Sequence, residues 1–183
     1  MPNRPRVVVI VLVSLVLAPL ALLAQSVAGF IDPMPTAKLK QLFPAANAFT
    51  PRSDRDPMYF TAFAGDPKAP GAQPLGWAFW TIDLVPAELG YHGHIHMLIG
   101  MNTQGRITGV IMDRNTEPYG DISINKPEFP LQFKGKSIRD KFEVGQDVDV
   151  TSRATISVRA AAREIREASR MVARAVLTPS AVR

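Results

Sequence analysis

Hydroxyl-bearing residues are concentrated just before the last helical segment of the chain. The run Asp149–Ser157 reads DVTSRATIS and leads directly into a long amphipathic stretch. At a helix start, unpaired backbone N–H groups and the positive end of the helix dipole attract anions. The run therefore predicts a phosphate-binding site, to which Arg153 and Arg159 would add positive charge. The alternative interpretation is an ordinary helix cap formed by Thr155 or Ser157.

A second chemical feature is the group of three histidines in the segment YHGHIH. If the segment is extended, His92, His94 and His96 point to one face, and imidazoles are ligands for copper or zinc. Alternate side chains of a strand lie about 7 Å apart. A metal needs its ligand atoms about 2 Å from one centre. Histidines that lie at the surface, or beside the ligand of the predicted phosphate site, without a metal are therefore the favoured interpretation.

The hydroxyl run must be positioned by the last helix. Residues 157–177 place small apolar side chains on one face and five arginines on another, which predicts an amphipathic helix that stops before Pro179. The arginine face is either simply solvated or a docking surface for an acidic redox partner or anionic lipid. The predicted buried face consists of Val158, Ala161, Ala162, Ile165, Ala168, Val172, Ala175 and Val176.

The middle of the chain has the composition of β-strands. Asn102 and Gly105 suit a turn, so the segments on either side of them predict a hairpin. Short helices are expected at Thr36–Phe43 and Ser137–Phe142. The pattern predicts an α+β domain with a central antiparallel sheet, flanking helices and a long C-terminal helix. The candidate strands are MYFTAFA (58–64), GWAFWTI (76–82), HIHMLIGM (94–101) and RITGVIMD (106–113).

The N-terminus has the pattern of an export segment. Two arginines without a nearby acid precede the apolar run Val7–Ala24. The length of this run is close to the minimum that a helix needs to cross a bilayer. Residues 1–28 are predicted to be a transmembrane signal anchor, or a signal peptide cleaved near Ala28, and residues 29–38 a linker. Residues 39–183 would then form one domain on the periplasmic side of a bacterial inner membrane.

Composition excludes several classes of protein. The chain of 183 residues contains no cysteine, so disulfides, thiolate metal sites and cysteine-linked haem are excluded. The formal charge is +5, but an exported domain rarely meets nucleic acid, so we expect no nucleic-acid partner. No Gly-rich phosphate loop, nucleophile elbow or zinc-protease motif is present, and no catalytic residue is predicted.

The run Asp149–Ser157 resembles the flavinylation motif of exported FMN-binding domains, Asp-x-x-Ser/Thr-Gly-Ala-Thr-x-Ser/Thr. That family includes the G subunit of Rnf complexes, the C subunit of the sodium-pumping quinone reductase and the N-terminal flavin domain of NosR-like regulators. The resemblance covers about residues 39–177. Further segments fall in the order expected for the NosR-like branch: Leu42-Phe43-Pro44, Leu75–Phe79, Gly105–Val110 and Glu117-Pro118-Tyr119-Gly120.

Carried over position by position, the resemblance implies that an FMN phosphate is esterified to the Thr155 hydroxyl. Glu117 and Pro118 match the loop that lies near the flavin in such domains. The remaining matched positions are Asp149 for the acid of the motif, Ser152 for its first hydroxyl, Ala154 for its alanine and Ser157 for its closing hydroxyl.

Arg153 departs from the motif, because glycine is commonest at this position. The change bears on recognition by the flavin transferase that installs FMN. A guanidinium could instead complement the phosphate, since its donors match phosphate oxygens.

Two hypotheses follow. The first is a membrane-anchored flavoprotein with covalent FMN, an electron-transfer component that meets membrane or periplasmic redox partners and is not a free-standing enzyme. The second is a non-redox accessory module that binds metal through His92, His94 and His96.

Overall fold

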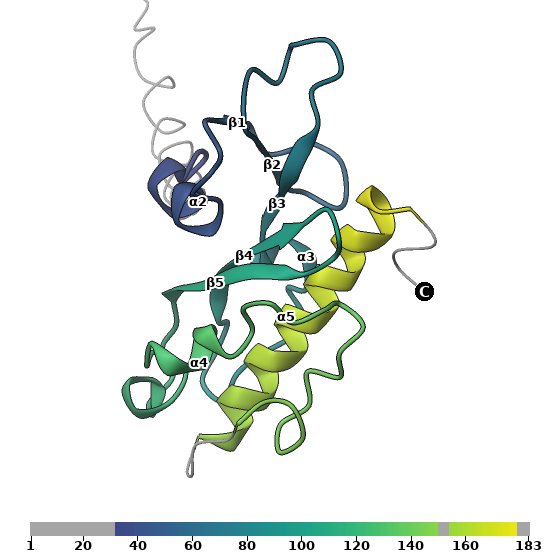
Figure 1. Cartoon of the computed structure of the whole chain (residues 1–183). Coiled ribbons are helices and arrows are strands. Elements are labelled where there is room, and N and C mark those ends of the chain that lie inside the picture. Colours follow the sequence, from purple (N-terminus) through teal and green to yellow (C-terminus); the bar gives the residue numbers. More distant parts are fainter. Residues whose placement is uncertain (1–31, 150–153, 179–183) are drawn as a thin grey trace, which may run out of the picture. The chain divides into compact units, whose positions relative to one another are not determined.

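An antiparallel sheet of five strands lies at the centre of the computed structural model, which describes residues 32–149 and 154–178 (Figure 1). Each strand pairs with the next one in sequence, so the order in the sheet is β1-β2-β3-β4-β5. The predicted antiparallel sheet is confirmed. The strands are β1 (Ala48–Thr50), β2 (Phe60–Phe63), β3 (Pro74–Trp80), β4 (His96–Asn102) and β5 (Ile107–Arg114).

The predicted hairpin joins β4 to β5, and its turn has the expected chemistry. The Asn102 side-chain oxygen accepts hydrogen bonds from the N–H groups of Gln104 and Arg106, at 3.0 and 2.9 Å. Gly105 has a φ of 70°, in the left-handed region that favours glycine. This turn sets the register that aligns the two strands.

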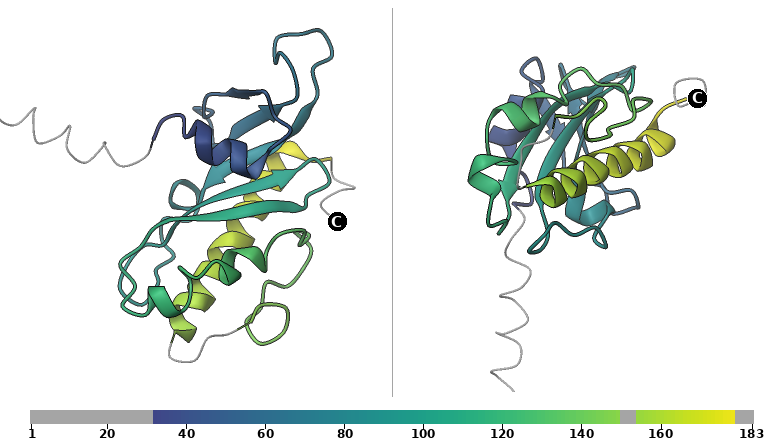
Figure 2. Two further views of the ribbon diagram at one scale, coloured as in Figure 1. Left: turned by 60° about the vertical axis from the view of Figure 1, so that its left-hand side comes forward. Right: turned by 90° about the horizontal axis from the view of Figure 1, so that it is seen from below.

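Helices cover both faces of the sheet, and Figure 2 shows α2 (Thr36–Leu42) and α5 (Thr155–Val176) on opposite sides. The strands alternate accordingly. In β4, Met97 and Ile99 belong to the core that packs against α5, whereas a Cβ at Gly100 would meet Leu42 of α2. Burial of β4 on both faces explains why its sequence is an almost continuous apolar run.

The C-terminal helix, predicted at residues 157–177, begins at Thr155 and ends at Val176, and it has the predicted inner face with two exceptions. Six of the eight predicted core residues are buried, but Ala175 is exposed and Val176 is only partly buried, because they lie in the last turn at the edge of the sheet. Trp77, Phe79 and Trp80 of β3 are also buried and belong to the hydrophobic core.

Two local predictions were wrong. Ser137–Phe142 is a turn and not a helix, because Asp140 accepts a hydrogen bond from the Ser137 N–H, at 2.9 Å, and Ser137 pairs with Arg106 in a β-bridge. The strand predicted at residues 76–82 ends at Trp80, where α3 (Thr81–Leu84) begins. The sequence also missed α4 (Glu128–Leu131), which contains Pro130.

No helix of the described residues is both long and apolar enough to cross a bilayer. The predicted signal anchor, residues 1–28, lies outside the described residues.

A carboxyl group is buried between α5 and α3. Glu164 is 3% exposed, and its Oε1 atom has no hydrogen-bond partner among the described residues. Burial raises the pKa of Glu164 from its ordinary value of 4.5 to about 8, and the carboxylates of Glu88 and Glu117 act in the same direction. Hydrogen bonding to Thr81 and the charge of Arg163 oppose this shift.

Glycine at position 76 is required by a close backbone approach. A Cβ at Gly76 would overlap the Met101 carbonyl oxygen of the paired strand β4. We expect Gly76→Ala to lower the free energy of unfolding by about 1–3 kcal/mol, because the strands must separate to admit it. Urea unfolding measures the change, and Gly65→Ala is the control, since no atom lies within 4 Å of a Cβ there. Equal effects of the two substitutions would contradict the packing argument.

Replacing Glu164 by glutamine should change how stability depends on pH. The folded pKa of about 8 lies above the ordinary 4.5, so the native protein retains a proton that the unfolded chain releases. The stability associated with that proton is fully present below pH 4.5 and is lost as the pH rises through about 8. We expect Glu164→Gln and the wild type to have the same free energy of unfolding at about pH 4.5. Above pH 8, the free energy of unfolding of Glu164→Gln should be a few kcal/mol higher than that of the wild type.

Urea unfolding across this pH range makes the comparison, with Glu128→Gln as an exposed control. Parallel pH profiles for the wild type and Glu164→Gln would show that the buried carboxyl does not titrate as expected.

Candidate functional site

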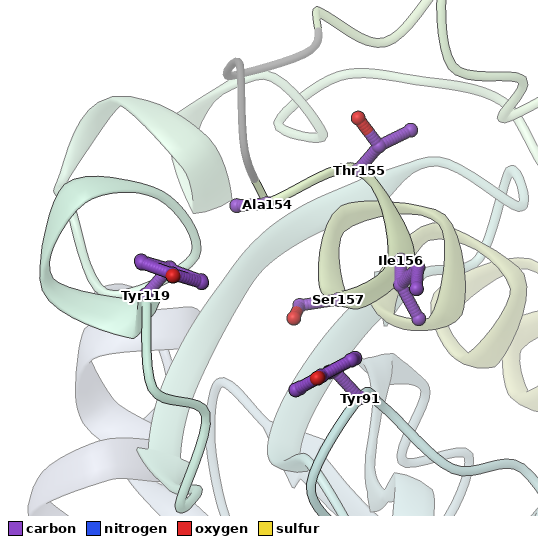
Figure 3. Close-up of a pocket in the computed structure, with 6 residues that line it drawn as sticks. All are labelled: Tyr91, Tyr119, Ala154, Thr155, Ile156 and Ser157. Atoms are coloured by element: carbon purple, nitrogen blue, oxygen red, sulfur yellow. The ribbon is translucent and has the colours of Figure 1, made fainter.

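A cavity of about 300 Å³ opens at the start of α5. It lies between the first turn of the helix and the two loops that precede β4 and follow β5 (Figure 3). Its volume is at the lower end of the range for small-molecule sites. The cavity is lined by Tyr91, Tyr119, Ala154, Thr155, Ile156 and Ser157.

The first turn of α5 lines this cavity and contains backbone N–H groups that have no partner within the helix. Ala154 is the N-cap residue and has no side chain to cap the helix. The hydrogen bond from the Val158 N–H to the Ala154 carbonyl, at 3.0 Å, begins the helical series, so the N–H groups of residues 155–157 have no partner within the helix. None of the first-turn residues is acidic. The interpretation of Thr155 or Ser157 as an ordinary N-cap is therefore wrong, and the helix start keeps its affinity for anions.

Two tyrosines form the aromatic wall of the cavity. Tyr91 is 63% exposed and Tyr119 is 49% exposed, and the Ser157 side chain lies between their rings in Figure 3. The Thr155 hydroxyl points away from both rings. Ile156, which is 56% exposed, closes another side. Large side chains exposed together at one cavity are typical of a binding site.

The buried carboxylate of Glu117 holds these walls together. It accepts hydrogen bonds from the backbone N–H groups of Tyr91 and His92, both at 2.9 Å, and a short hydrogen bond from the Ser157 hydroxyl. Glu117 is 7% exposed. A Cβ at Gly90 would lie 2.5 Å from its Oε1 atom, so glycine is needed where the loop passes the carboxylate. One side chain thereby connects the loop before β4, the loop after β5 and α5.

The structure brings together some of the residues predicted from the sequence. Thr155, Ala154 and Ser157 line the cavity, and Glu117 lies beneath it. Pro118 is exposed and does not line the cavity. Asp149 is exposed outside the cavity, where its backbone N–H donates to the Gln132 side chain at 2.7 Å. Ser152 and Arg153 lie outside the described residues.

Sequence reasoning missed Tyr91, Tyr119 and Ile156 as parts of the site. Both tyrosines lie in short segments rich in glycine and proline, where the chain reads GYHG and EPYG. A tyrosine in such a loop is not buried in a sheet, so the composition of the two loops was the signal that could have identified these tyrosines as part of a site. Ile156 interrupts a polar run, and its exposure could not be inferred from the amphipathic pattern of the helix.

The histidines do not form a metal centre. Among residues 32–149 and 154–178, no group of three or more His, Asp, Glu or Cys side chains could hold a metal ion. The rings of His94 and His96 meet edge to face, with centroids 6.3 Å apart, and His92 lies near Thr116. Burial, together with the charges of Arg114 and His94, lowers the pKa of His96 below its ordinary 6.5.

Comparisons with known proteins match the part of the chain that contains the cavity. Residues 90–170 match the family described as FMN-binding domain, and this range contains the whole cavity. The G subunit of the ion-translocating oxidoreductase complex of Shewanella oneidensis is 29% identical over 125 residues, which are 63% of this chain and 54% of that protein. The corresponding protein of Vibrio atlanticus is 29% identical over 126 residues, 63% of this chain and 55% of its own.

A third relative, the G subunit from Pseudomonas aeruginosa, is 34% identical over 91 residues, which are 44% of this chain and 42% of that protein. The chain thus matches about half the length of these relatives. The resemblance to FMN-binding domains and to the G subunit is confirmed: residues 90–170 match the FMN-binding domain family, and the chain is homologous to the G subunits of ion-translocating oxidoreductase complexes over the matched part.

Proposed function

We propose that this protein is an electron-transfer flavoprotein whose FMN is attached through its phosphate to the Thr155 hydroxyl. The observation that carries the proposal is the position of Thr155. It is the first residue of α5, at the rim of a cavity with exposed aromatic walls, within the segment that matches FMN-binding domains. The Thr155 side chain is only partly buried, so a modifying enzyme can reach it.

The helix start fits the phosphate end of the cofactor. Three backbone N–H groups without helical partners, at residues 155–157, adjoin the attachment point, and the helix dipole favours a negative group there. The nearby Glu117 carboxylate does not compete for these donors. Its oxygens already accept hydrogen bonds from Tyr91, His92 and the Ser157 side chain.

The tyrosines fit the ring end of the cofactor. Aromatic faces stack on planar rings, and Tyr91 and Tyr119 are exposed on either side of the cavity. A cavity of about 300 Å³ is small for the whole of FMN. Part of the ring system would therefore remain outside the cavity, where partners can reach it. When bound, FMN supplies the capacity to carry one or two electrons.

A covalent bond suits a cofactor made in the cytoplasm and used outside it, because a dissociable flavin would be lost. We therefore place residues 39–183 on the periplasmic side of the inner membrane, after a linker at residues 29–38 and a signal anchor or signal peptide at residues 1–28. Attachment requires a flavin transferase. The relatives are subunits of ion-translocating oxidoreductase complexes, so we expect redox partners in the membrane.

The attachment site can be tested by mass. Expressed with a flavin transferase, the protein should remain yellow after denaturation and carry the mass of FMN less one water on the peptide that contains Thr155. Thr155→Ala should lose this mass, and Thr155→Ser should regain it in part because serine also offers a hydroxyl. Thr151→Ala is the matched control from the same run. A colourless wild-type protein, or a label that Thr155→Ala retains, would refute covalent attachment at this residue.

The Glu117 carboxylate should be needed for the shape of the cavity. Glutamine at position 117 has one oxygen fewer to accept hydrogen bonds, so a buried N–H or hydroxyl group would lose its partner. We expect Glu117→Gln to lower the free energy of unfolding by about 1–3 kcal/mol and to reduce the flavinylated fraction. Urea unfolding and intact mass measure the two effects.

Glu128→Gln, at an exposed carboxylate, is the control and should change neither quantity. If Glu117→Gln behaves like this control, the carboxylate does not hold the walls together.

A further inference from the structure

Arginine side chains line two further cavities that follow one another along α5. The first, of about 410 Å³, is lined by Phe142, Glu143, Val144, Arg159, Arg163 and Arg166. The second, of about 360 Å³, is lined by Ile138, Arg139, Arg170 and Arg174. We call the six arginines together the arginine surface. From Arg159 to Arg174 it extends about 22 Å along the helix axis.

The arginine surface begins next to the proposed flavin cavity. Ile156 lines the flavin cavity, and Arg159, three residues later, lines the first arginine cavity. Residues at this spacing are neighbours on a helix surface. The segment that follows α4 runs beside α5 in Figure 1. Its residues 138–139 and 142–144 line the two arginine cavities opposite the helix. A molecule that covers the flavin cavity can therefore also contact the arginines.

The charge of this surface is only partly compensated. Arg163 pairs with Glu88 and Arg166 with Glu167, and Glu143 lines the first cavity. The five guanidinium groups that α5 contributes thus face three carboxylates.

Arg170 donates to two backbone carbonyl oxygens, those of Ile138 and Asp140, both at 3.0 Å. These bonds hold its guanidinium in place without neutralising its charge. Arg159 and Arg174 are exposed and make no hydrogen bond or ion pair with the described residues.

Apolar side chains are distributed differently from the arginines. Tyr91, Tyr119 and Ile156 are exposed at the flavin cavity, whereas no large exposed apolar side chain of the described residues lines either arginine cavity. A helix that inserts into lipid presents apolar groups beside its basic ones. A charged surface adjoining a small apolar patch fits a protein partner with an acidic face, which electrostatics would steer toward the patch.

We propose that the arginine surface docks the acidic face of a soluble redox protein, so that its redox centre comes to the mouth of the flavin cavity. The electron transfer in this proposal rests on the proposed function, because it requires bound FMN. The binding of the partner does not depend on FMN. When FMN is bound and reduced, it would give one electron to the oxidised centre of the partner. No bond forms between the proteins, and any proton released goes to solvent.

Binding is tested first, with oxidised flavodoxin as the acidic probe protein and calorimetry at several salt concentrations. Arg159→Gln/Arg174→Gln removes two exposed charges that make no hydrogen bond or ion pair with the described residues. The matched control, Arg55→Gln/Lys68→Gln, removes two exposed charges from the loops that flank β2. We expect the first double variant to weaken binding by about tenfold at low salt and the control by less than about twofold. Added salt should weaken wild-type binding.

Electron transfer is tested second, by the rate at which the reduced protein is reoxidised. Each ferricyanide anion accepts one electron, and hexaammineruthenium(III) is the cationic counterpart. Arg159→Gln/Arg174→Gln should slow the anionic oxidant and not the cationic one. A protein without flavin gives no reoxidation signal yet still binds flavodoxin, which separates a failure of the proposed function from a failure of the docking proposal.

Three results would overturn the docking proposal. The first is a flavodoxin affinity that does not depend on salt. The second is an equal loss of affinity in both double variants. The third is a wild-type protein that binds phosphatidylglycerol vesicles but not flavodoxin, together with loss of the vesicle binding in Arg159→Gln/Arg174→Gln. The arginines would then recognise lipid.

Discussion

The site depends on one buried carboxylate, because three segments distant in sequence meet at Glu117. A charged group at 7% exposure is costly unless donors surround it, and here two backbone N–H groups and the Ser157 hydroxyl do so. The backbone of Glu117 is also held in place, since its N–H donates to the side-chain oxygen of Asn115 at 3.2 Å. If any of these partners moved, a buried charge would lose a donor, so the cavity walls are fixed relative to one another.

In this arrangement the start of α5 has two separate roles, one in holding Glu117 and one in binding an anion. Ser157 directs its hydroxyl inward to Glu117, while Thr155, two residues earlier, directs its hydroxyl away from the tyrosines. The backbone N–H groups of the first turn remain available to a ligand because the N-cap, Ala154, has no polar side chain. A negative carboxylate and an anion-binding helix start can therefore lie close together without competing for the same donors.

Much of the fold could be predicted from periodicity, because the decisive signals were local. The hairpin followed from Asn102 and Gly105, and α5 followed from the spacing of its alanines and arginines. The end of β3 at Trp80 was not predictable, since it depends on Thr81, whose hydroxyl donates to the Ile95 carbonyl and accepts from the Met97 N–H. The same difference between local and long-range signals holds for the residues of the site. Thr155 was found through a motif, whereas Tyr91 enters the cavity only through a long-range hydrogen bond to Glu117.

The order of the elements has a consequence for how the chain reaches its native state. Each strand pairs with its neighbour in sequence, so the sheet can assemble from local contacts as the chain emerges. The helix that covers one face of this sheet is the last element, and until it docks, Phe79, Met97 and Ile99 lie uncovered. A chain that lacked α5 would therefore expose this apolar surface and be prone to aggregate.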